Sequence, residues 1–534
     1  MTTDSEGNAG VLLALVQTLR TLGVHECCVA AGARNAAIIA VLQQLQPEFH
    51  LRHFFEERSA AFFALGRVMD SRRPVAVITT SGTAAAELLP AVIEAHYQGL
   101  PLVAVTADRP ERYCGSGAPQ AIEQEGLFGC YVRHVHQLSG HLLVHSGWAG
   151  EMEPVHINVR LEEGPPPPHG LNFGAICGGL PLLPSGHLLP DEARQDWDEF
   201  WANDLPTVVL ASGLHPEEAA WVTPFLAKLA LPIVAEATAN LPSDGALQRW
   251  MLRGGETALQ KGRFARVLRI GGVPSWRWWR DLEDRRDVPL MNLSRTAFRG
   301  LARQHNVCTL TWEALEWPVP APEPLAHQHA NWGQCLDEIL DKLPLSEPAW
   351  MRHLSLAIGP EAKVFLGNSL PIREWNLAGA PLPRGAQVFA NRGANGIDGL
   401  LSTWLGTSLD APESWAIIGD LSALYDLSAP WILPQLPPNR RRLVIINNGG
   451  GKIFSHVGWM ASLPAETLQL IENPHQHRFD AWAAMWGLSY RAITAARQLT
   501  EAHSHSSKAL EVWEIRPNAE QTEAFWHEWG QAAK

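Results

Sequence analysis

The stretches WAIIGDLSALYDL at residues 415–427 and LVIINNGGG at residues 443–451 decide the fold of the last third of the chain. Each begins with a short apolar run of the kind that forms a buried strand, and each run ends in polar residues and glycine. A helical stretch separates the two runs, and this order predicts two parallel strands that lie next to each other. Asp420 and Asn448, 28 residues apart, are therefore both expected at carboxyl ends of strands, where α/β folds bind ligands.

The residues at these two strand ends have the chemistry of a magnesium site that also holds a diphosphate. A carboxylate from Asp420, an amide oxygen from Asn448 and a backbone carbonyl at Gly450 are ligands that suit Mg²⁺, and Mn²⁺ takes the same kind. Glycine also lets the backbone approach phosphate groups closely. The alternative is turn chemistry after two strands, which either motif alone would favour. A nucleotide-triphosphate loop is excluded because Ile453 follows Lys452 where Ser or Thr is required.

The same alternation of strands and helices extends through the chain and predicts an α/β fold. We expect three domains, each a mainly parallel sheet flanked by helices, because 534 residues exceed one hydrophobic core. Proline-rich stretches at residues 165–168 and 317–324 indicate linkers, and the predicted domains are residues 1–185, 186–340 and 341–534. The predicted strands are 26–31, 75–79, 102–106, 207–211, 232–235, 266–270, 363–366, 387–390, 415–418 and 443–446.

Composition and charge exclude several classes of function. The formal net charge is −13, whereas a protein whose main partner is a nucleic acid usually has a basic field. No run of 18 apolar residues predicts a membrane span, and the polar, acidic N-terminal residues do not resemble a secretory signal. The seven cysteines form no Cys-x-x-Cys pair, which argues against a disulfide framework and a structural zinc site. A cytoplasmic location is therefore expected.

Four longer strings carry a resemblance to a known family. GDLSALYDL at 419–427, NRGANGIDGLLST at 391–403, GNSLPIR at 367–373 and TADRPER at 106–112 resemble the 2-succinyl-5-enolpyruvyl-6-hydroxy-3-cyclohexene-1-carboxylate (SEPHCHC) synthases, which are thiamine-diphosphate enzymes. The resemblance implies thiamine diphosphate with Mg²⁺ as cofactors, and a reaction that joins 2-oxoglutarate to isochorismate in menaquinone biosynthesis. It implies a pyrimidine-binding first domain, a cofactor-free central domain and a diphosphate-binding third domain. It also implies a homodimer as the minimal unit, or a homotetramer.

The resemblance assigns the main catalytic role to Glu57. This residue follows an apolar and aromatic strand, His53-Phe54-Phe55. Thiamine chemistry needs one carboxylic acid at the aminopyrimidine ring, where it hydrogen-bonds a ring nitrogen and promotes loss of the C2 proton. The alternative is a solvated Glu beside Arg58. The resemblance also implies these cofactor-binding residues: Ser81, Gly82, Thr83, Ile397, Gly419, Asp420, Leu421, Ser422, Asn448, Gly450, Ile453 and Phe454.

Ile397 matches the apolar side chain that bends the bound cofactor, and ordinary core packing is compatible with that role. The substrates are polycarboxylates, and the planar fork of Arg pairs bidentately with a carboxylate. Taken singly, an Arg is more often a surface residue. Arg373, Arg392 and Ser369 match the 2-oxoglutarate side, and Gln120 matches a contact to isochorismate. The full set of substrate-binding residues that the resemblance implies is Arg34, Arg109, Gln120, Arg277, Ser369, Arg373 and Arg392.

Three positions depart from the family on the isochorismate side. Ala33, Pro119 and Trp276 stand where the family usually has Ser, Asn and Lys, so that a hydroxyl, an amide and a cation are lost. One alternative is another thiamine-diphosphate-dependent 2-oxo acid decarboxylase or carboligase with a different acceptor. A second is a paralogue that binds cofactor without turnover, and the intact Glu57 and Asp420 speak against it.

Overall fold

The computed structural model describes residues 3–138, 153–164, 191–242, 245–309, 332–456, 458–499 and 510–532. These residues form three parallel sheets of six, five and six strands, which confirms the predicted α/β class with three sheets flanked by helices. The proline-rich stretches 165–168 and 317–324 and the predicted boundary at residue 185 lie outside the described residues. The other predicted boundary, at residue 340, falls within helix α10 (Trp332–Lys342).

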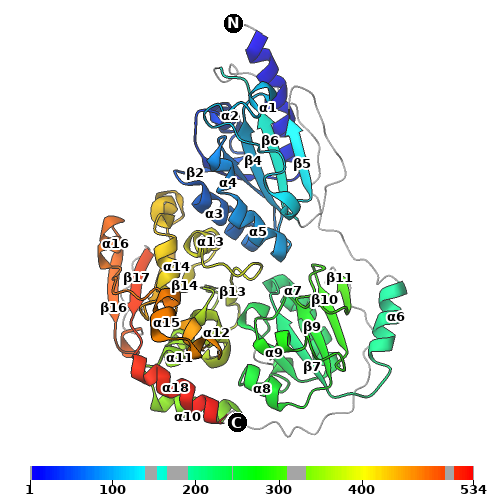
Figure 1. The fold of residues 1–534 in the computed structure, drawn as a ribbon, viewed down its shortest axis with the longest axis vertical. Helices are drawn as coiled ribbons and strands as arrows, with labels where there is room; N and C mark the ends of the chain where they lie inside the picture. Colours follow the sequence, from blue (N-terminus) through cyan, green and yellow to red (C-terminus); the bar gives the residue numbers. More distant parts are fainter. Residues whose placement is uncertain are drawn as a thin grey trace. The chain divides into compact units, whose positions relative to one another are not determined.

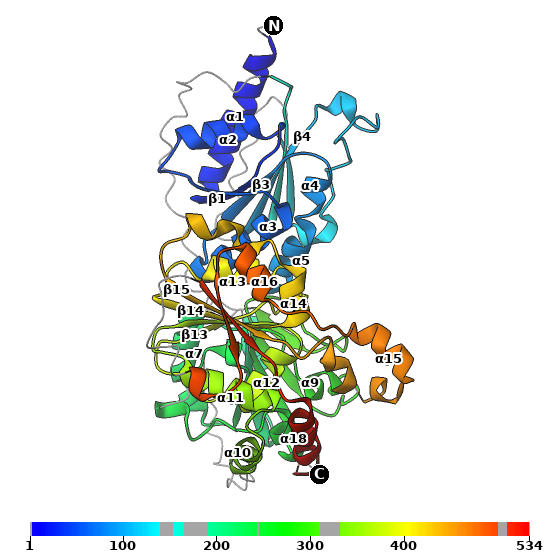
Figure 2. The same cartoon turned by 90° about the vertical axis from the view of Figure 1, so that its left-hand side faces the viewer.

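The first sheet has the strand order β2-β1-β3-β4-β6-β5 (Figures 1 and 2). Helices α1 and α2 pack on one face, and the apolar core there includes Leu15, Ile38, Ile78 and Val105. The strands are β1 (Glu26–Ala30), β2 (His50–Phe54), β3 (Val75–Thr79), β4 (Leu102–Asp108), β5 (His134–Leu138) and β6 (Val155–Arg160), and the helices are α1 (Thr3–Thr21), α2 (Ala36–Gln44), α3 (Glu57–Ser71), α4 (Thr83–Ala86) and α5 (Leu89–Gln98).

The central sheet has the order β11-β10-β9-β7-β8. Alternate residues of β7 face opposite cores, since Val209 packs with α7 whereas Val208 packs with Trp279 of α9. The strands are β7 (Thr207–Ser212), β8 (Ile233–Ala235), β9 (Arg266–Gly271), β10 (Leu290–Ser294) and β11 (Asn306–Thr309), and the helices are α6 (Asp191–Phe200), α7 (Pro216–Leu229), α8 (Glu256–Lys261) and α9 (Arg277–Asp281).

The third sheet has the order β13-β12-β14-β15-β17-β16. β14 and β15 are parallel neighbours, with Gly419 opposite Ile446, which agrees with the strand–helix–strand prediction. The strands are β12 (Lys363–Leu366), β13 (Gln387–Phe389), β14 (Glu413–Gly419), β15 (Arg440–Ile446), β16 (Ser489–Ile493) and β17 (Leu510–Ile515), and the helices include α11 (Glu347–Ala357), α12 (Leu370–Ala378), α14 (Asp420–Tyr425), α15 (Ala465–Glu472), α16 (Asp480–Met485) and α18 (Ala519–Ala532).

The chain packs as two compact units that do not follow the sequence order strictly. The first unit contains residues 1–184, 393–410 and 425–437, and the second contains residues 185–392, 411–424 and 438–534. Helix α13 (Leu400–Thr407) and the 3₁₀ helix η6 (Ala429–Gln435) therefore belong to the first unit, although they lie late in the sequence.

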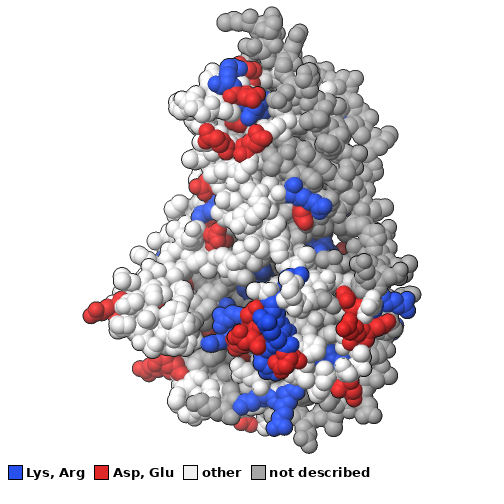
Figure 3. All heavy atoms as spheres, turned by 45° about the vertical axis from the view of Figure 1, so that its right-hand side comes forward, with Lys and Arg blue, Asp and Glu red and all other residues white. Residues whose placement is uncertain are grey.

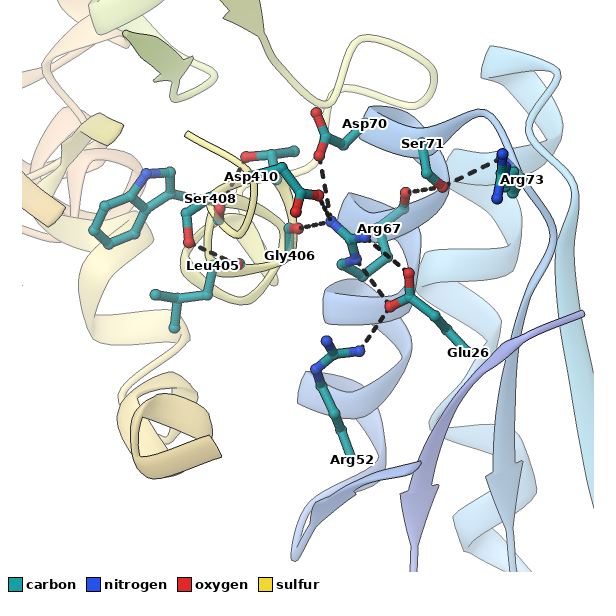
Figure 4. A network of polar contacts seen from close by, with 12 residues as sticks. Glu26, Arg52, Arg67, Asp70, Ser71, Arg73, Leu405, Gly406, Ser408 and Asp410 are labelled. Carbon is teal, nitrogen blue, oxygen red and sulfur yellow. Dashed lines mark hydrogen bonds and ion pairs between the residues drawn. The ribbon is translucent and has the colours of Figure 1, made fainter. Parts of the chain in front are cut away.

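An ion-pair network supports the packing of α13 against α3 within the first unit (Figure 4). The guanidinium of Arg67 donates to both carboxylate oxygens of Glu26, at 3.0 and 2.8 Å, and to Asp410 at 3.1 Å. Arg52 donates to the same Glu26 at 2.6 Å. The network joins the C-terminal half of α3 and the residues after α13 to Glu26 of β1. It thereby supports the packing of α3, which begins with Glu57, against α13, which follows the loop of Ile397.

The distribution of charged side chains on the face seen in Figure 3 agrees with the negative net charge of the chain. Lys and Arg side chains alternate there with Asp and Glu side chains and do not form a continuous basic field among the described residues. No helix in the described part of the chain is long and apolar enough to cross a membrane.

Candidate cofactor and substrate site

The carboxylate of Asp420 organises the backbone at the ends of β14 and β15. Its Oδ2 accepts hydrogen bonds from the N–H groups of Gly449 and Gly450, at 2.8 and 3.0 Å, and its Oδ1 accepts one from Leu421 at 2.6 Å. Gly449 and Gly450 have φ values of 82° and 141°, which other residues rarely adopt. The NNGGG motif is therefore folded around the side chain of Asp420.

Asn448 lies beside this turn with its two amide ends in different surroundings. Its Nδ2 donates to both oxygens of Glu347, at 3.2 and 3.0 Å. Its Oδ1 is buried and accepts no hydrogen bond from any described residue. A buried acceptor without a donor is costly unless a ligand satisfies it. The carbonyl oxygen of Gly450 accepts one hydrogen bond, from Lys452 at 2.9 Å, and keeps a second lone pair.

These groups fit a magnesium ion. Asp420 is 2% exposed, and together with the free oxygen of Asn448 it offers a carboxylate and an amide oxygen, the hard donors that Mg²⁺ prefers. Burial raises the pKa of Asp420, while the nearby His475 and three backbone N–H groups lower it. The His475 Nε2 atom lies 3.3 Å from Asp420 Oδ2. A cation at this position would hold Asp420 in the ionised form.

Ile453 and Phe454 lie in the 3₁₀ helix η7 (Lys452–His456) and are half-buried. Leu421 and Ser422 lie in α14, directly after Gly419 and Asp420. All the predicted cofactor-binding residues from Gly419 to Phe454 thus gather at one end of β14 and β15, within the second unit.

Two buried carboxyl groups lie next to each other beside the metal-site residues, and only Glu347 contacts Asn448; sequence reasoning did not single them out. Glu347 is 2% exposed and Glu374 is 0% exposed. Burial raises the pKa of both, and the negative charge of Glu347 raises the pKa of Glu374 further. The oxygens of Glu374 meet no donor from the other residues that the structure describes.

The residues predicted to hold 2-oxoglutarate also lie in the second unit. Ser369 is the N-cap of α12, with a φ of 76°, and Arg373 lies one turn further along. Arg392 donates from Nη1 to Asn368 Oδ1 at 2.9 Å, and this bond ties it to the start of α12. Partial loss of hydration and the positive charge of Arg392 lower the pKa of Arg373. The structure therefore brings Ser369, Arg373 and Arg392 together.

The central sheet contributes a loop to the same region. Arg373 donates from Nη1 to the carbonyl oxygen of Ser275 at 3.2 Å. Arg277, the first residue of α9, has a side chain that is 61% exposed and lies 3.8 Å from Asp281. Trp276 is only 8% exposed and packs in the core around Trp279. The position where the resemblance implies a Lys is thus a core position in this chain.

The remaining predicted residues lie in the first unit, near the ends of its strands or, for Ile397, in the loop before α13. Glu57 is the first residue of α3, three residues after the end of β2, and is half-buried. Burial raises the pKa of Glu57, its own backbone N–H lowers it, and the negative charges of Glu56 and Glu87 raise it further. A carboxyl group with a raised pKa is suited to share a proton with a ring nitrogen.

The turn Ser81-Gly82-Thr83 follows β3 and leads into α4. Gly82 has a φ of 87°, and a Cβ atom there would lie 3.2 Å from the Cα of Gln120. The predicted cofactor turn and the loop predicted to contact isochorismate therefore touch. Gln124, which sequence reasoning also missed, fixes this contact because its Oε1 accepts from the N–H of Gly82 at 3.0 Å.

Arg109 and Arg34 lie at the ends of β4 and β1. The N–H of Arg109 donates to Asp108 Oδ1 at 2.7 Å, and its guanidinium lies 5.3 Å from the ring centre of Tyr113. Arg34 donates from Nη1 to the carbonyl oxygen of Leu161 at 3.2 Å. Ile397 is half-buried in the loop before α13. The predicted residues thus form two sets, one in each unit.

The first unit contains a sequence signature of the thiamine-diphosphate enzymes. Residues 11–127 match the family described as "Thiamine pyrophosphate enzyme, N-terminal TPP binding domain". In fold, the chain is similar to a thiamine diphosphate-dependent 4-hydroxybenzoylformate decarboxylase from Rhodococcus jostii RHA1, with a TM-score of 0.68 over 95% of this chain and 99% of that one. At 15% identity this likeness concerns the fold alone. The protein therefore belongs to the class of thiamine-diphosphate-dependent enzymes.

Full-length relatives narrow this class to one family. A protein from Bdellovibrio bacteriovorus named 2-succinyl-5-enolpyruvyl-6-hydroxy-3-cyclohexene-1-carboxylate synthase is 38% identical and covers 99% of both chains. A protein of the same name from Akkermansia muciniphila is 39% identical over 94% of this chain and 95% of its own length. The chain belongs to the SEPHCHC synthase family.

Proposed function

We propose that the protein decarboxylates 2-oxoglutarate and adds the resulting succinyl unit to isochorismate, using thiamine diphosphate and Mg²⁺. The product is 2-succinyl-5-enolpyruvyl-6-hydroxy-3-cyclohexene-1-carboxylate, an intermediate of menaquinone biosynthesis. Membership of the family supports the reaction. The structural observation that carries the proposal is the pair Asp420 and Asn448 at the ends of β14 and β15, with the buried Oδ1 of Asn448 left without a donor among the described residues.

Asp420, Asn448 and the carbonyl of Gly450 would hold the cation and, through it, the diphosphate. When bound, thiamine diphosphate supplies the carbon nucleophile and the electron sink for decarboxylation. Glu57 would share a proton with the pyrimidine nitrogen, and its burial, which raises the pKa of the carboxyl group, favours the protonated form that this hydrogen bond needs. The half-buried Ile397 would pack against the cofactor and fix its shape.

The cluster Ser369, Arg373 and Arg392 would bind the carboxylates of 2-oxoglutarate. Two Arg side chains close together favour a dianion, because each lowers the cost of binding negative charge beside the other. The Asn368 contact orients Arg392 from one side, and the Ser275 carbonyl orients Arg373 from the other. Their role is to place the keto carbon and to hold the substrate during loss of CO₂.

Arg34, Arg109 and Gln120 would bind the carboxylates and polar groups of isochorismate, with Arg277 as a further cation. Three positions on this side are less polar than usual for the family, and Trp276 is buried in the core. This observation keeps a second candidate open, a thiamine-diphosphate-dependent carboligase that uses 2-oxoglutarate with another acceptor.

The proposed assembly is a homodimer or a homotetramer in the cytoplasm. Family resemblance supports it, since each active site in these enzymes combines the pyrimidine-binding domain of one subunit with the diphosphate-binding domain of another.

One assay tests the proposed function. Purified protein is incubated with thiamine diphosphate, Mg²⁺ and 2-oxoglutarate, with and without isochorismate, and the products are identified by mass spectrometry. We expect the SEPHCHC mass only when isochorismate is present. Consumption of 2-oxoglutarate without that product would support the second candidate, and no consumption would contradict both.

A further inference from the structure

Glu347 and Glu374 form a buried carboxyl pair that the proposed reaction does not use. Glu347 is the first residue of α11, and Glu374 lies in α12 directly after Arg373. Both are almost completely buried. A carboxylate at a helix start favours the helix, and this effect accounts for an acid at position 347. It does not account for burial, nor for the contact with Asn448.

The contact is specific in its geometry. Both Glu347 oxygens accept from the single Nδ2 atom of Asn448, at 3.2 and 3.0 Å. An amide side chain presents NH₂ at one end and oxygen at the other, and the two ends have nearly the same shape. A carboxylate accepts hydrogen bonds and cannot donate them when ionised. It therefore selects the NH₂ end and turns the oxygen away.

The oxygen that is turned away has no partner among the described residues. It belongs to Asn448, two residues after the end of β15, and the N–H of the adjacent Gly449 donates to Asp420, the residue after the end of β14. We propose that Glu347 is a positioning residue that holds the Asn448 amide so that its oxygen, and not its NH₂ group, faces the cation. The inference rests on the metal site of the proposed function.

Residues that position a metal ligand have a measurable effect on metal affinity. Partners behind a metal ligand fix its orientation and raise the basicity of its donor atom, and their loss typically costs about 10- to 100-fold in metal affinity. In E347Q the new amide offers its own NH₂ group to Asn448. In a fraction of the E347Q molecules the Asn448 oxygen then accepts from the amide introduced at position 347, and the Asn448 NH₂ group faces the cation. The NH₂ group carries partial positive charge and repels the cation.

The nearby Glu374 provides a matched control. In E374Q an amide replaces the carboxyl group at the same depth, in contact with Glu347 and not with Asn448. Its NH₂ group can donate to Glu347, and Glu347 keeps both oxygens as acceptors for Asn448. A merely structural role of the pair predicts similar losses in E347Q and E374Q. A positioning role predicts a loss of metal affinity in E347Q alone.

The test is a titration of Mg²⁺ into the full-length protein with saturating thiamine diphosphate, followed by calorimetry and by intrinsic tryptophan fluorescence. Melting temperatures are measured without Mg²⁺ in parallel. We expect E347Q to bind Mg²⁺ about 10- to 100-fold more weakly than wild type, and E374Q to bind it with an affinity close to wild type. Wild-type affinity in E347Q would overturn the proposal, and so would equal losses in both variants.

If E347Q does not fold, exchanging the carboxylate at position 347 and the amide at position 448 still tests the proposal. N448D alone places two carboxylates against each other, whereas E347Q/N448D restores one amide and one carboxylate in swapped places. The carboxylate introduced by N448D would present an oxygen to the cation in either orientation, so the double variant should bind Mg²⁺ about tenfold or more tightly than N448D. No recovery would contradict the proposal. A wild type that binds Mg²⁺ and cofactor but makes no product would refute the proposed function and leave this inference standing.

Discussion

Gln124 accepts a hydrogen bond from the N–H of Gly82 at 3.0 Å and thereby joins the predicted cofactor turn to the acceptor side of the first unit. The Nε2 of Gln124 donates to Asn158 Oδ1 at 2.9 Å, and Asn158 Nδ2 donates to Asp108 Oδ2 at 2.8 Å. The same carboxylate accepts the N–H of Arg109 at 2.7 Å. A continuous chain of buried hydrogen bonds therefore runs from Gly82 to Arg109.

Replacing Gln124 with Leu should destabilise the protein. Gln124 is 1% exposed, and the change leaves the N–H of Gly82 without its acceptor in a buried turn. A buried polar group left without a partner costs about 1–3 kcal/mol. Urea unfolding measures this loss, and Q120A, at an exposed position of the same loop, should change stability by less than about 0.5 kcal/mol. Equal stability of Q124L and wild type would show that the hydrogen-bond chain contributes nothing.

Asp426 should make stability fall as pH rises. Its side chain is 0% exposed and accepts hydrogen bonds from the N–H and Oγ of Ser402, at 2.8 and 3.1 Å. Burial raises its pKa from 3.8 to about 6. Folding therefore favours the protonated acid, and this contribution is complete below pH 3.8 and is lost as pH rises through about 6.

The variant D426N removes this dependence. As the pH rises from about 4.5 to 7.5, the free energy of unfolding of wild type should fall by about 2 kcal/mol relative to that of D426N, as measured by urea unfolding. The matched control is D410N, whose side chain is 67% exposed in wild type, and it should show a much smaller change over the same range. A constant difference between D426N and wild type across this range would be incompatible with a raised pKa.

Glu57→Gln should separate cofactor binding from catalysis. The amide keeps the shape of the side chain at the start of α3 but has no acidic proton to share with the pyrimidine nitrogen. We expect the variant to bind thiamine diphosphate and to lose about 10²–10⁴ in rate. Exchange of the cofactor C2 proton in deuterated water, followed by NMR, reports the affected step. Exchange at the wild-type rate would remove Glu57 from this role.

The two groups of Arg residues should affect different half-reactions. Arg392 lies beside Arg373 and Ser369, whereas Arg109 lies at the end of β4 in the other unit. Arg392→Ala should impair decarboxylation of 2-oxoglutarate, and Arg109→Ala should impair only the transfer to isochorismate. Loss of one partner of a desolvated charge pair costs about 2–5 kcal/mol, so both effects are measurable.

Stopped-flow spectroscopy with 2-oxoglutarate alone follows the first half-reaction, and full turnover follows both. If Arg109→Ala slowed the first half-reaction as much as Arg392→Ala does, the proposed division between the two groups would be wrong.

The sequence predicted the parts of the fold that have a strong local signal. β14 and β15 are apolar runs that end in glycine and polar residues, and the structure places them as parallel neighbours. The strands that were missed include the interior strands β6, β10 and β17, whose apolar runs are broken by polar residues, and the edge strands β5 (HVHQL) and β16 (SYRAI). An edge strand is partly solvated and alternates less clearly, and its composition does not distinguish it from a loop.

The site could be predicted only where the residues form a motif. Asp420 and Asn448 are within one motif, but Glu347 precedes Asn448 by 101 residues and meets it only through the packing of α11. Gln124 and Asn158 are likewise joined by a non-local contact between a loop and β6. Such pairs depend on the tertiary fold, and an isolated Glu or Gln in a sequence gives no sign of its partner.

The central claim, that the chain transfers the decarboxylated part of 2-oxoglutarate to isochorismate, is tested most directly by isotope tracing. The wild-type protein with thiamine diphosphate, Mg²⁺ and isochorismate is given 2-oxoglutarate labelled with ¹³C either at C1 or at C2. The account predicts that the C1 label leaves as CO₂ and that the C2 label appears in the new ketone carbon of the SEPHCHC product. Retention of the C1 label in the product, or release of succinic semialdehyde with isochorismate unchanged, would contradict it.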